Sequence, residues 1–256
     1  MVTVRDIYDF LDEMAPFDLV AEVDNSGLLV GGFENEVHKV LLSLDITNEV
    51  VREAHELGAE LIISHHPVIY NPIKFLDTKS VPYNLAKFGV NAICAHINLD
   101  VCPGGVSHCL AQRLNLKNLK NLTYFLKGDK PLGFIGDLEN EMQAKDFTLY
   151  VKNQLDCEGA RYTYVEKTIK KVAVCSGAGG ECVHDAVKKG ADAFVTGEIK
   201  HHEILVANSE NLMIVAAGHY KSEDVVMGPL KDALSNHFKD VEFYRTKVFT
   251  DKINYL

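Results

Sequence analysis

Short apolar runs alternate with helical segments through most of this chain, and this alternation is what most constrains its fold. Residues 40–45, 60–64 and 90–95 are apolar runs of strand length. The segments near 48–57 and 82–88 between them have apolar residues at helical spacing. A strand–helix–strand order of this kind predicts parallel βαβ units whose strands are buried on both faces.

The second half of the chain repeats this order. It contains predicted strands at 171–175, 193–196, 212–217 and 241–245 and predicted helices at 182–189, 199–207 and 222–238. The residues repeat as well, because GAELIISHH at 58–66 has a counterpart in GADAFVT at 190–196, which is followed by His201 and His202. We infer an internal duplication of one α/β unit.

The region between the two halves breaks the alternation. Residues 115–168 contain a stretch rich in Lys and Asn, several Gly and Pro residues, and a polar helix candidate at 141–154. The sequence therefore predicts an α/β protein with two similar lobes, in which mostly parallel sheets are flanked by helices. The predicted boundaries are 1–114 for the first lobe, 115–168 for a connector and 169–256 for the second lobe.

Composition excludes several classes of function. The chain has 256 residues with 26 Lys and Arg against 36 Asp and Glu, a net charge of −10, and we expect no nucleic-acid partner. No apolar stretch reaches the roughly 18 residues of a membrane span, so we expect a soluble cytoplasmic protein. The six cysteines form no C-x-x-C pair, and we expect them to be reduced and mostly buried.

Histidines and carboxylates collect where the predicted strands end. The residues concerned are His65 and His66 after the second strand, His96 and Asp100 after the third, and His219 and Glu223 after its counterpart. In parallel α/β sheets, ligands bind outside the carboxyl ends of the strands. Imidazole and carboxylate together suit Zn, Fe, Mn, Co or Ni, and two carboxylates among several histidines can bridge two ions. The pattern predicts a dinuclear metal site.

A structural role is the alternative for each of these histidines, since a single His at a strand end is more often hydrogen-bonded within the fold. The adjacent pair His65-His66 before Pro67 argues against packing alone. Successive side chains of a strand point in opposite directions, so one of the two would need a polar partner. In a loop, both can turn toward one centre.

Four motifs occur in order: SHHP at 64–67, AHINLD at 95–100, TGEIKHH at 196–202 and GHYKSE at 218–223. With them the chain resembles the dinuclear-metal-centre family, also described as NGG1-interacting-factor-like proteins or GTP cyclohydrolase 1 type 2 homologues. The segments 24–31 and 176–180 extend this resemblance over about residues 1–245. Two positions depart from the family pattern: Val23 stands where Trp is usual, and Ser107 where Asn is usual. The connector is too short for the domain inserted in longer members, so the chain resembles the short form.

The resemblance implies two lobes that face each other across a metal-containing cleft, and assembly into a homohexameric ring. It implies two divalent ions (Fe, Zn or Mn) held by His65, His66, Asp100, His219 and Glu223. Asp100 and Glu223 would be the bridging ligands. It also implies that His96, His201 and His202 lie beside the ions or face a substrate.

Two bridged ions favour a metal-dependent hydrolase of a small nucleotide-like or phosphorylated substrate. His96, His201 or His202 would then carry protons, since imidazole titrates near neutral pH. One alternative is a metal chaperone or trafficking protein for iron or zinc, which would have a partner in metallocofactor assembly. Another is a ring-shaped interaction protein that metal only stabilises. The Gly-rich turn 176–180 could hold an anion on its backbone N–H groups or be a plain tight turn, and both interpretations stay open.

Overall fold

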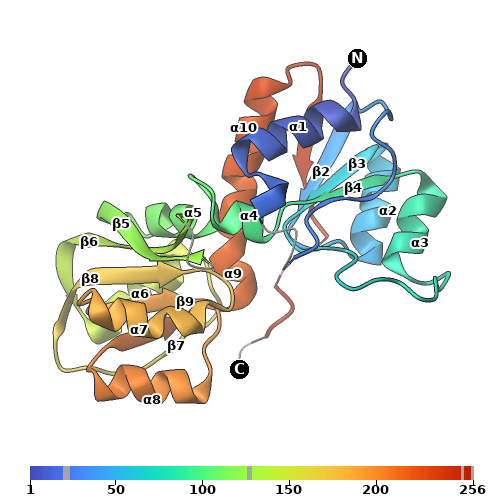
Figure 1. The fold of residues 1–256 in the computed structure, drawn as a ribbon. Coiled ribbons are helices and arrows are strands. Elements are labelled where there is room, and N and C mark those ends of the chain that lie inside the picture. Colours follow the sequence, from blue (N-terminus) through green and yellow to red (C-terminus); the bar gives the residue numbers. More distant parts are fainter. Residues whose placement is uncertain (20–23, 126–128, 249–250, 255–256) are drawn as a thin grey trace. The chain divides into compact units, whose positions relative to one another are not determined.

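The computed structural model describes residues 1–19, 24–125, 129–248 and 251–254, which form two compact units (Figure 1). Unit 1 comprises Met1–Cys102 and Met227–Thr250, and unit 2 comprises Pro103–Val226 and Asp251–Leu256. Each unit has its own sheet flanked by helices, which confirms the α/β class. Val23 lies outside the described residues. None of the described helices is long and apolar enough to cross a membrane.

Unit 1 is a five-stranded sheet with the strand order β1-β4-β3-β2-β11. Its strands are β1 (Gly27–Val30), β2 (Lys39–Ser43), β3 (Leu61–Ser64), β4 (Asn91–Cys94) and β11 (Glu242–Arg245). Its helices are α1 (Val4–Met14), a 3-10 turn (Phe17–Leu19), α2 (Asn48–Leu57), α3 (Val81–Phe88), α4 (Ile97–Asp100) and α10 (Met227–His237). β11, β2, β3 and β4 are parallel, and β1 is antiparallel to β4.

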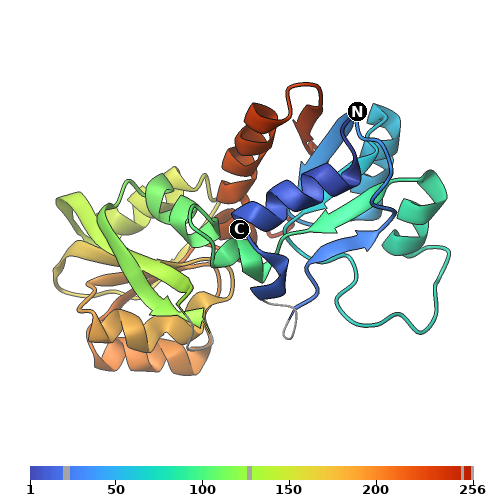
Figure 2. The ribbon, with the colours of Figure 1, turned by 45° about the horizontal axis from the view of Figure 1, so that its top comes forward.

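Apolar side chains alternate between the two faces of this sheet. Leu41, Ile62 and Ala92 pack against α2 and α3. The opposite face is covered by α1 and α10 (Figures 1 and 2). Helix α2 begins where the Thr47 hydroxyl accepts from the backbone of Val50, and it ends at Gly58, whose φ of 72° is left-handed. The three central strands β2, β3 and β4 are therefore buried on both faces, as their near-continuous apolar runs predict.

Unit 2 is a six-stranded sheet with the order β5-β6-β8-β9-β10-β7. Its strands are β5 (Lys117–Tyr124), β6 (Pro131–Gln143), β7 (Arg161–Tyr162), β8 (Thr168–Cys175), β9 (Ala193–Thr196) and β10 (Met213–Ala216). Its helices are α5 (Val106–Arg113), α6 (Ala144–Gln154), α7 (Val183–Lys188), α8 (His201–Ser209) and α9 (His219–Glu223), with 3-10 turns at Gly179–Cys182 and Asp224–Val226. Only β8, β9 and β10 are parallel to one another, and β5, β6 and β7 pair antiparallel. The prediction of mostly parallel sheets is therefore correct only for the central strands.

Two hydrophobic clusters hold unit 2 together, one on each face of its sheet. α5 and α6 cover one face, where Phe147 packs among Val172, Val195 and their neighbours. α7 and α8 cover the other face, where Phe194 is central. Both phenylalanines are fully buried, so each face has its own large anchoring side chain.

The two units share a carboxylate that accepts hydrogen bonds from two successive backbone N–H groups. In unit 1 the Glu60 carboxylate accepts from the backbone N–H groups of His38 and Lys39, at 3.0 and 2.8 Å. In unit 2 the Asp192 carboxylate accepts from those of Lys170 and Lys171, at 3.1 and 2.9 Å. Glu60 and Asp192 occupy the same place in the repeated GAE and GAD sequences. The sequence repeat thus corresponds to matching hydrogen bonds, which lie at the start of β2 in unit 1 and within β8 in unit 2.

The domain boundaries differ from those predicted. Residues 115–168 are no separate connector, because β5, β6, α6 and β7 form part of the sheet and the core of unit 2. The C-terminal α10 and β11 return to unit 1, where β11 pairs with β2. The helix predicted over 222–238 is broken by the 3-10 turn Asp224–Val226, and the chain leaves unit 2 at that turn.

All six cysteines are buried and form no disulfide in the structure, as the sequence predicts. Burial raises the pKa of both Cys109 and Cys157 to about 11, so these thiols stay protonated at neutral pH. Cys109 and Cys157 therefore pack in the core as small apolar side chains.

Replacement of Phe147 tests whether α6 belongs to the core of unit 2. Because its ring is fully buried, we expect Phe147→Ala to lower the free energy of unfolding by about 3–5 kcal/mol. Leu149 lies on the same helix with 48% exposure, and Leu149→Ala should cost only about 0.5 kcal/mol. Chemical denaturation measures both. Equal effects would mean that 115–168 is a peripheral connector after all.

Candidate metal centre

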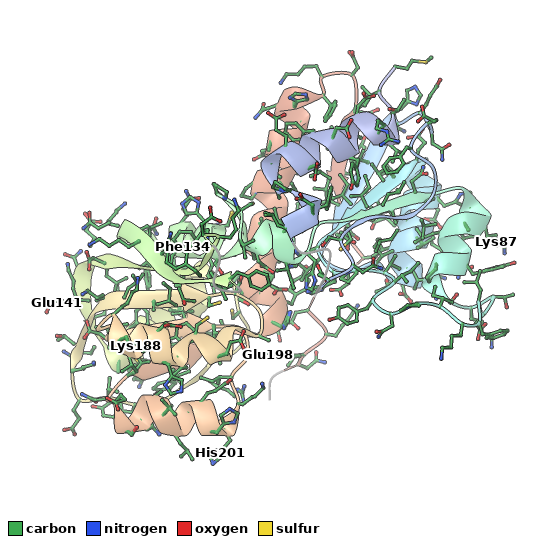
Figure 3. All side chains as sticks on the ribbon, viewed as in Figure 1. Lys87, Phe134, Glu141, Lys188, Glu198 and His201 are labelled. Carbon is green, nitrogen blue, oxygen red and sulfur yellow. The ribbon has the colours of Figure 1, made fainter. Side chains whose placement is uncertain are left out.

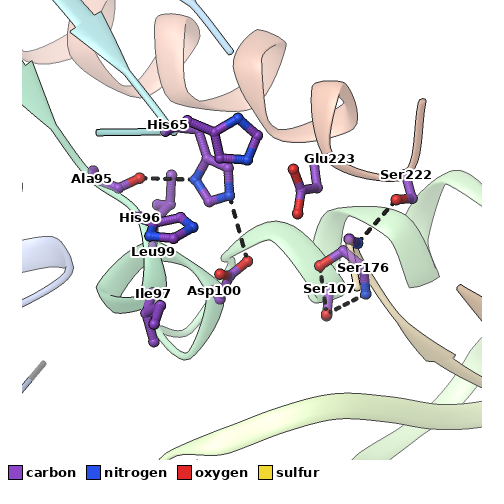
Figure 4. Close-up of polar contacts among 12 residues, drawn as sticks. His65, Ala95, His96, Ile97, Leu99, Asp100, Ser107, Ser176, Ser222 and Glu223 are labelled. Atoms are coloured by element: carbon purple, nitrogen blue, oxygen red, sulfur yellow. Dashed lines mark hydrogen bonds and ion pairs between the residues drawn. The ribbon is translucent and has the colours of Figure 1, made fainter. Parts of the chain in front are cut away.

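The carboxyl end of β3 in unit 1 carries two adjacent imidazoles. His65 is buried, and its Nδ1 lies 2.9 Å from the carbonyl oxygen of Ala95 (Figure 4). His66 follows in the loop, where its Nδ1 lies 2.9 Å from a carboxylate oxygen of Asp45, the second residue after β2. The two neighbouring parallel strands therefore deliver a histidine and its carboxylate partner to the same edge of the sheet.

A third imidazole follows β4. The Nδ1 of His96 lies 2.9 Å from Oδ1 of Asp24, and the Asp24 side chain is fully buried. Asp24 also accepts from the Ser26 hydroxyl at 2.7 Å. Burial alone would raise the pKa of the Asp24 carboxyl, but the hydrogen bonds from His96 and Ser26 outweigh it and lower this pKa to about 2. Asp24 is thus ionised at neutral pH.

The three imidazoles of unit 1 converge. One ring nitrogen from each of His65, His66 and His96 lies within 4.8 Å of the others, a grouping that could hold a metal ion. Their ring centroids are 5.0–5.5 Å apart. Asp100, the last residue of α4, places Oδ1 3.8 Å from Nε2 of His65 (Figure 4). Unit 1 therefore brings together four of the residues predicted from sequence.

Unit 2 carries a smaller cluster at the carboxyl ends of β9 and β10. His219 is the first residue of α9, and its Nε2 lies 3.0 Å from Oε2 of Glu223, four residues later on the same helix. Its Nδ1 lies 3.3 Å from Oε1 of Glu198, which follows β9. The predicted pair His219 and Glu223 thus shares one face of a single helical turn.

The Gly-rich turn 176–180 packs against the helix that carries His219 and Glu223. Gly177 has a left-handed φ of 57°, and a Cβ there would run into the Glu223 carboxylate. Its N–H donates to the Ser222 hydroxyl at 3.0 Å. Ser107 accepts from the backbone N–H of Ser176 at 3.1 Å, so the departure at position 107 puts a hydroxyl on this turn (Figure 4). The glycine is needed for close approach of the protein's own carboxylate, which favours the tight-turn interpretation over an anion site.

His201 and His202 lie apart from this cluster. Both are exposed on the first turn of α8, and His201 points outward from the helix (Figure 3). Within the part of the chain that the structure describes, neither forms a group of three candidate ligands with other His, Cys, Asp or Glu residues. Their predicted position beside an ion or a substrate remains a prediction.

Three carboxylates in contact with these imidazoles were not predicted as site residues: Asp24, Asp45 and Glu198. A signal for two of them was present, because Asp45 ends the predicted strand 40–45 and Glu198 lies two residues after the predicted strand 193–196. Asp24 lies in a loop far from His96 in sequence, and only the fold brings the two together.

Gly197 offers a test of how closely this site is packed. A Cβ at Gly197 would lie 2.6 Å from the Gly177 carbonyl oxygen and 2.9 Å from Cα of His219, so we expect Gly197→Ala to cost about 1–3 kcal/mol of unfolding free energy. Gly228 in α10 has open space around it, and Gly228→Ala should be neutral or stabilise by up to about 1 kcal/mol. Thermal or urea denaturation compares the two. A Gly197→Ala protein as stable as the parent would show that the turn is not packed against α9.

The chain is similar in sequence and in fold to known proteins over almost its whole length. The profile of the Duf34/NIF3 (NGG1p interacting factor 3) family matches residues 2–252. A GTP cyclohydrolase 1 type 2 homolog of Clostridium perfringens is 31% identical over 260 residues, covering 99% of both chains, and one of Campylobacter jejuni is 34% identical over 86% of this chain and 87% of its own. The crystal structure of the Staphylococcus aureus hypothetical protein SA1388 superposes with a TM-score of 0.91 at 30% identity and covers 99% of both chains. This chain belongs to the Duf34/NIF3 family.

Proposed function

We propose that this protein binds two divalent metal ions through His65, His66, Asp100, His219 and Glu223, with Asp100 and Glu223 as bridging ligands. The observation that carries the proposal is the convergence of His65, His66 and Asp100: the two imidazole centroids are 5.0 Å apart, and Oδ1 of Asp100 lies 3.8 Å from Nε2 of His65. The pair His219 and Glu223 adds an imidazole and a carboxylate 3.0 Å apart. We further propose that the two units descend from one duplicated α/β unit, and that their ligands meet in one centre.

The donor set fits divalent metals such as Fe, Zn or Mn, which accept imidazole and carboxylate together. Metal-binding histidines usually engage their other ring nitrogen with a carboxylate or a backbone carbonyl. In this chain the Nδ1 atoms of His65, His66 and His219 lie 2.9, 2.9 and 3.3 Å from such oxygens. When bound, divalent ions supply Lewis acidity toward water and substrate oxygen.

We propose that the reaction is hydrolysis of a small nucleotide-like or phosphorylated substrate. His96 is the imidazole that we propose as proton carrier, because Asp24 fixes its Nδ1 and leaves proton exchange to Nε2. His201 and His202 stand as further candidates for substrate contact. The names of the relatives make GTP the first substrate to test, beside simple phosphate esters.

A metal-trafficking role is the second candidate. A carrier needs an ion position from which metal can leave, whereas a structural site is closed. The side chains of His219 and Glu198 are 34% and 59% exposed, which favours such an exchangeable position in unit 2. A partner in metallocofactor assembly would then receive or deliver the ion.

Elemental analysis of protein purified without chelator tests the assignment. We expect two ions per chain, both lost in Asp100→Ala and in Glu223→Ala because each carboxylate is proposed to bridge. His201→Ala should keep both ions and lower only the turnover of GTP or a phosphate ester. Glu210 is an exposed carboxylate of unit 2, and Glu210→Ala is the control. A full metal complement in Glu223→Ala would contradict the bridging assignment.

The same preparations distinguish the two candidate functions. Two ions that survive mild chelation, together with turnover, would support the hydrolase. One labile ion without turnover would support trafficking.

We also propose a homohexamer. Large apolar side chains are exposed in the loop between β3 and α3, where Phe75 is 82% and Tyr70 60% exposed, and an interface between copies would bury them. Light scattering should give about six times 28.4 kDa. Phe75→Asp should lower that mass, while the exposed polar replacement Lys74→Asp should not. A monomeric parent protein would contradict the proposal.

A further inference from the structure

We propose that Asp45 and Glu198, together with Asp24, are positioning residues that fix the orientation and tautomer of the imidazoles at the candidate centre. This inference rests on the proposed function, because it concerns how His66 and His219 are prepared to bind metal. In each case a carboxylate oxygen contacts Nδ1: Asp45 on His66 at 2.9 Å, Asp24 on His96 at 2.9 Å and Glu198 on His219 at 3.3 Å.

The tautomer follows from what each group can donate. A neutral imidazole carries one proton on one of its two nitrogens, and an ionised carboxylate can only accept a hydrogen bond. The proton must therefore sit on Nδ1 of His66 and His96. His219 contacts a carboxylate at each nitrogen, Glu223 at Nε2 at 3.0 Å and Glu198 at Nδ1 at 3.3 Å, so Glu198 favours the Nδ1–H form of this ring when an ion occupies Nε2. Nε2 is then the nitrogen with the lone pair that can bind a metal or take up a proton. Such partners also hold the ring plane, so the ligand is set before the ion arrives.

The three contacts differ in how firmly they hold the ring. The Asp24 side chain is fully buried, and the Ser26 hydroxyl also donates to it. Asp45 is 38% exposed, and Glu198 is 59% exposed with the longest contact. Water competes with exposed hydrogen bonds, so the order of restraint is Asp24, then Asp45, then Glu198. The imidazoles of unit 1 are therefore held more firmly than His219.

An ion that depends on His219 should leave faster than one that depends on His66, because the His219 ring gains more freedom whenever the bond to the metal breaks. Loss of an outer carboxylate partner commonly lowers metal affinity about 10–100-fold. We expect Asp45→Asn near the upper end of that range and Glu198→Gln near the lower end.

The experiment uses the full chain and Co²⁺ as the probe. Histidine tautomers are read in the metal-free protein from long-range ¹⁵N–¹H correlations, and Co²⁺ affinity and release rate from the visible absorption of the bound ion. The variants are Asp45→Asn, Glu198→Gln and Asp24→Asn. Glu198 is exposed, so Glu198→Gln should fold even where the buried Asp24→Asn does not.

Two matched controls each remove a carboxylate that accepts hydrogen bonds from the backbone and contacts none of the candidate ligands. Glu60 and Asp192 accept from strand N–H groups in units 1 and 2. Glu60→Gln and Asp192→Asn should lower stability, while the tautomers of His66 and His219 and the Co²⁺ affinity stay within about twofold of the parent. A purely structural role for Asp45 or Glu198 would make the test variants behave like these controls.

The metal-free parent protein is expected to show Nδ1–H tautomers at His66 and His96. Loss of that preference at His66 in Asp45→Asn, together with weaker and faster-releasing Co²⁺ in both Asp45→Asn and Glu198→Gln, would support the inference. Parent-like affinity in both variants, or Nε2–H tautomers at His66 and His96 in the metal-free parent, would overturn it. A parent that binds no Co²⁺ would overturn the proposed function instead, and the tautomers would still decide whether the carboxylates position the rings.

Discussion

The contact between each imidazole Nδ1 and an oxygen of the protein is the interaction on which the candidate centre depends. Four imidazoles have it: His65 with the Ala95 carbonyl, and His66, His96 and His219 with carboxylates. Without such a partner a histidine in a loop could turn either nitrogen toward an ion and would lose rotamer freedom on binding. At His66 and His96 the carboxylate partners favour one ring orientation and leave Nε2 as the nitrogen with the lone pair, so we propose that these partners prepare the rings before an ion binds.

The parallel strands explain how one edge of a sheet can supply both members of such a pair. Asp45 and His66 follow β2 and β3, which are paired in register from Val40 and Leu61 onward. Glu198 and His219 follow β9 and β10 in the same way. Parallel neighbours end at the same edge, so a carboxylate after one strand meets an imidazole after the next. In unit 2, α9 can pack closely against the turn because Gly177 and Gly197 have no side chain.

The sequence predicts those elements whose hydrophobic pattern matches their burial in the fold. The βαβ order, the α/β class and the placement of histidines at strand ends follow from buried apolar runs with polar residues directly after them. The strands in residues 115–168 could not be recognised from sequence. β5 is mostly exposed and rich in Lys and Asn, and its left-handed Asn118 and irregular register hide the alternation of apolar and polar residues typical of a strand. The return of β11 to unit 1 has no local signal, since it depends on which sheet offers an open edge. Asp24 was missed because its partner His96 lies 72 residues away.

The central claim, that these histidines and carboxylates hold two metal ions, is tested most directly by anomalous diffraction. Crystals of the protein grown with a zinc salt and measured on both sides of the zinc absorption edge would locate each ion. The account predicts two anomalous peaks, one within coordination distance of His65 or His66 and one of His219, with Asp100 and Glu223 reaching both. Peaks only at exposed residues such as His201 or His202, or no peak at the imidazoles of unit 1, would contradict it.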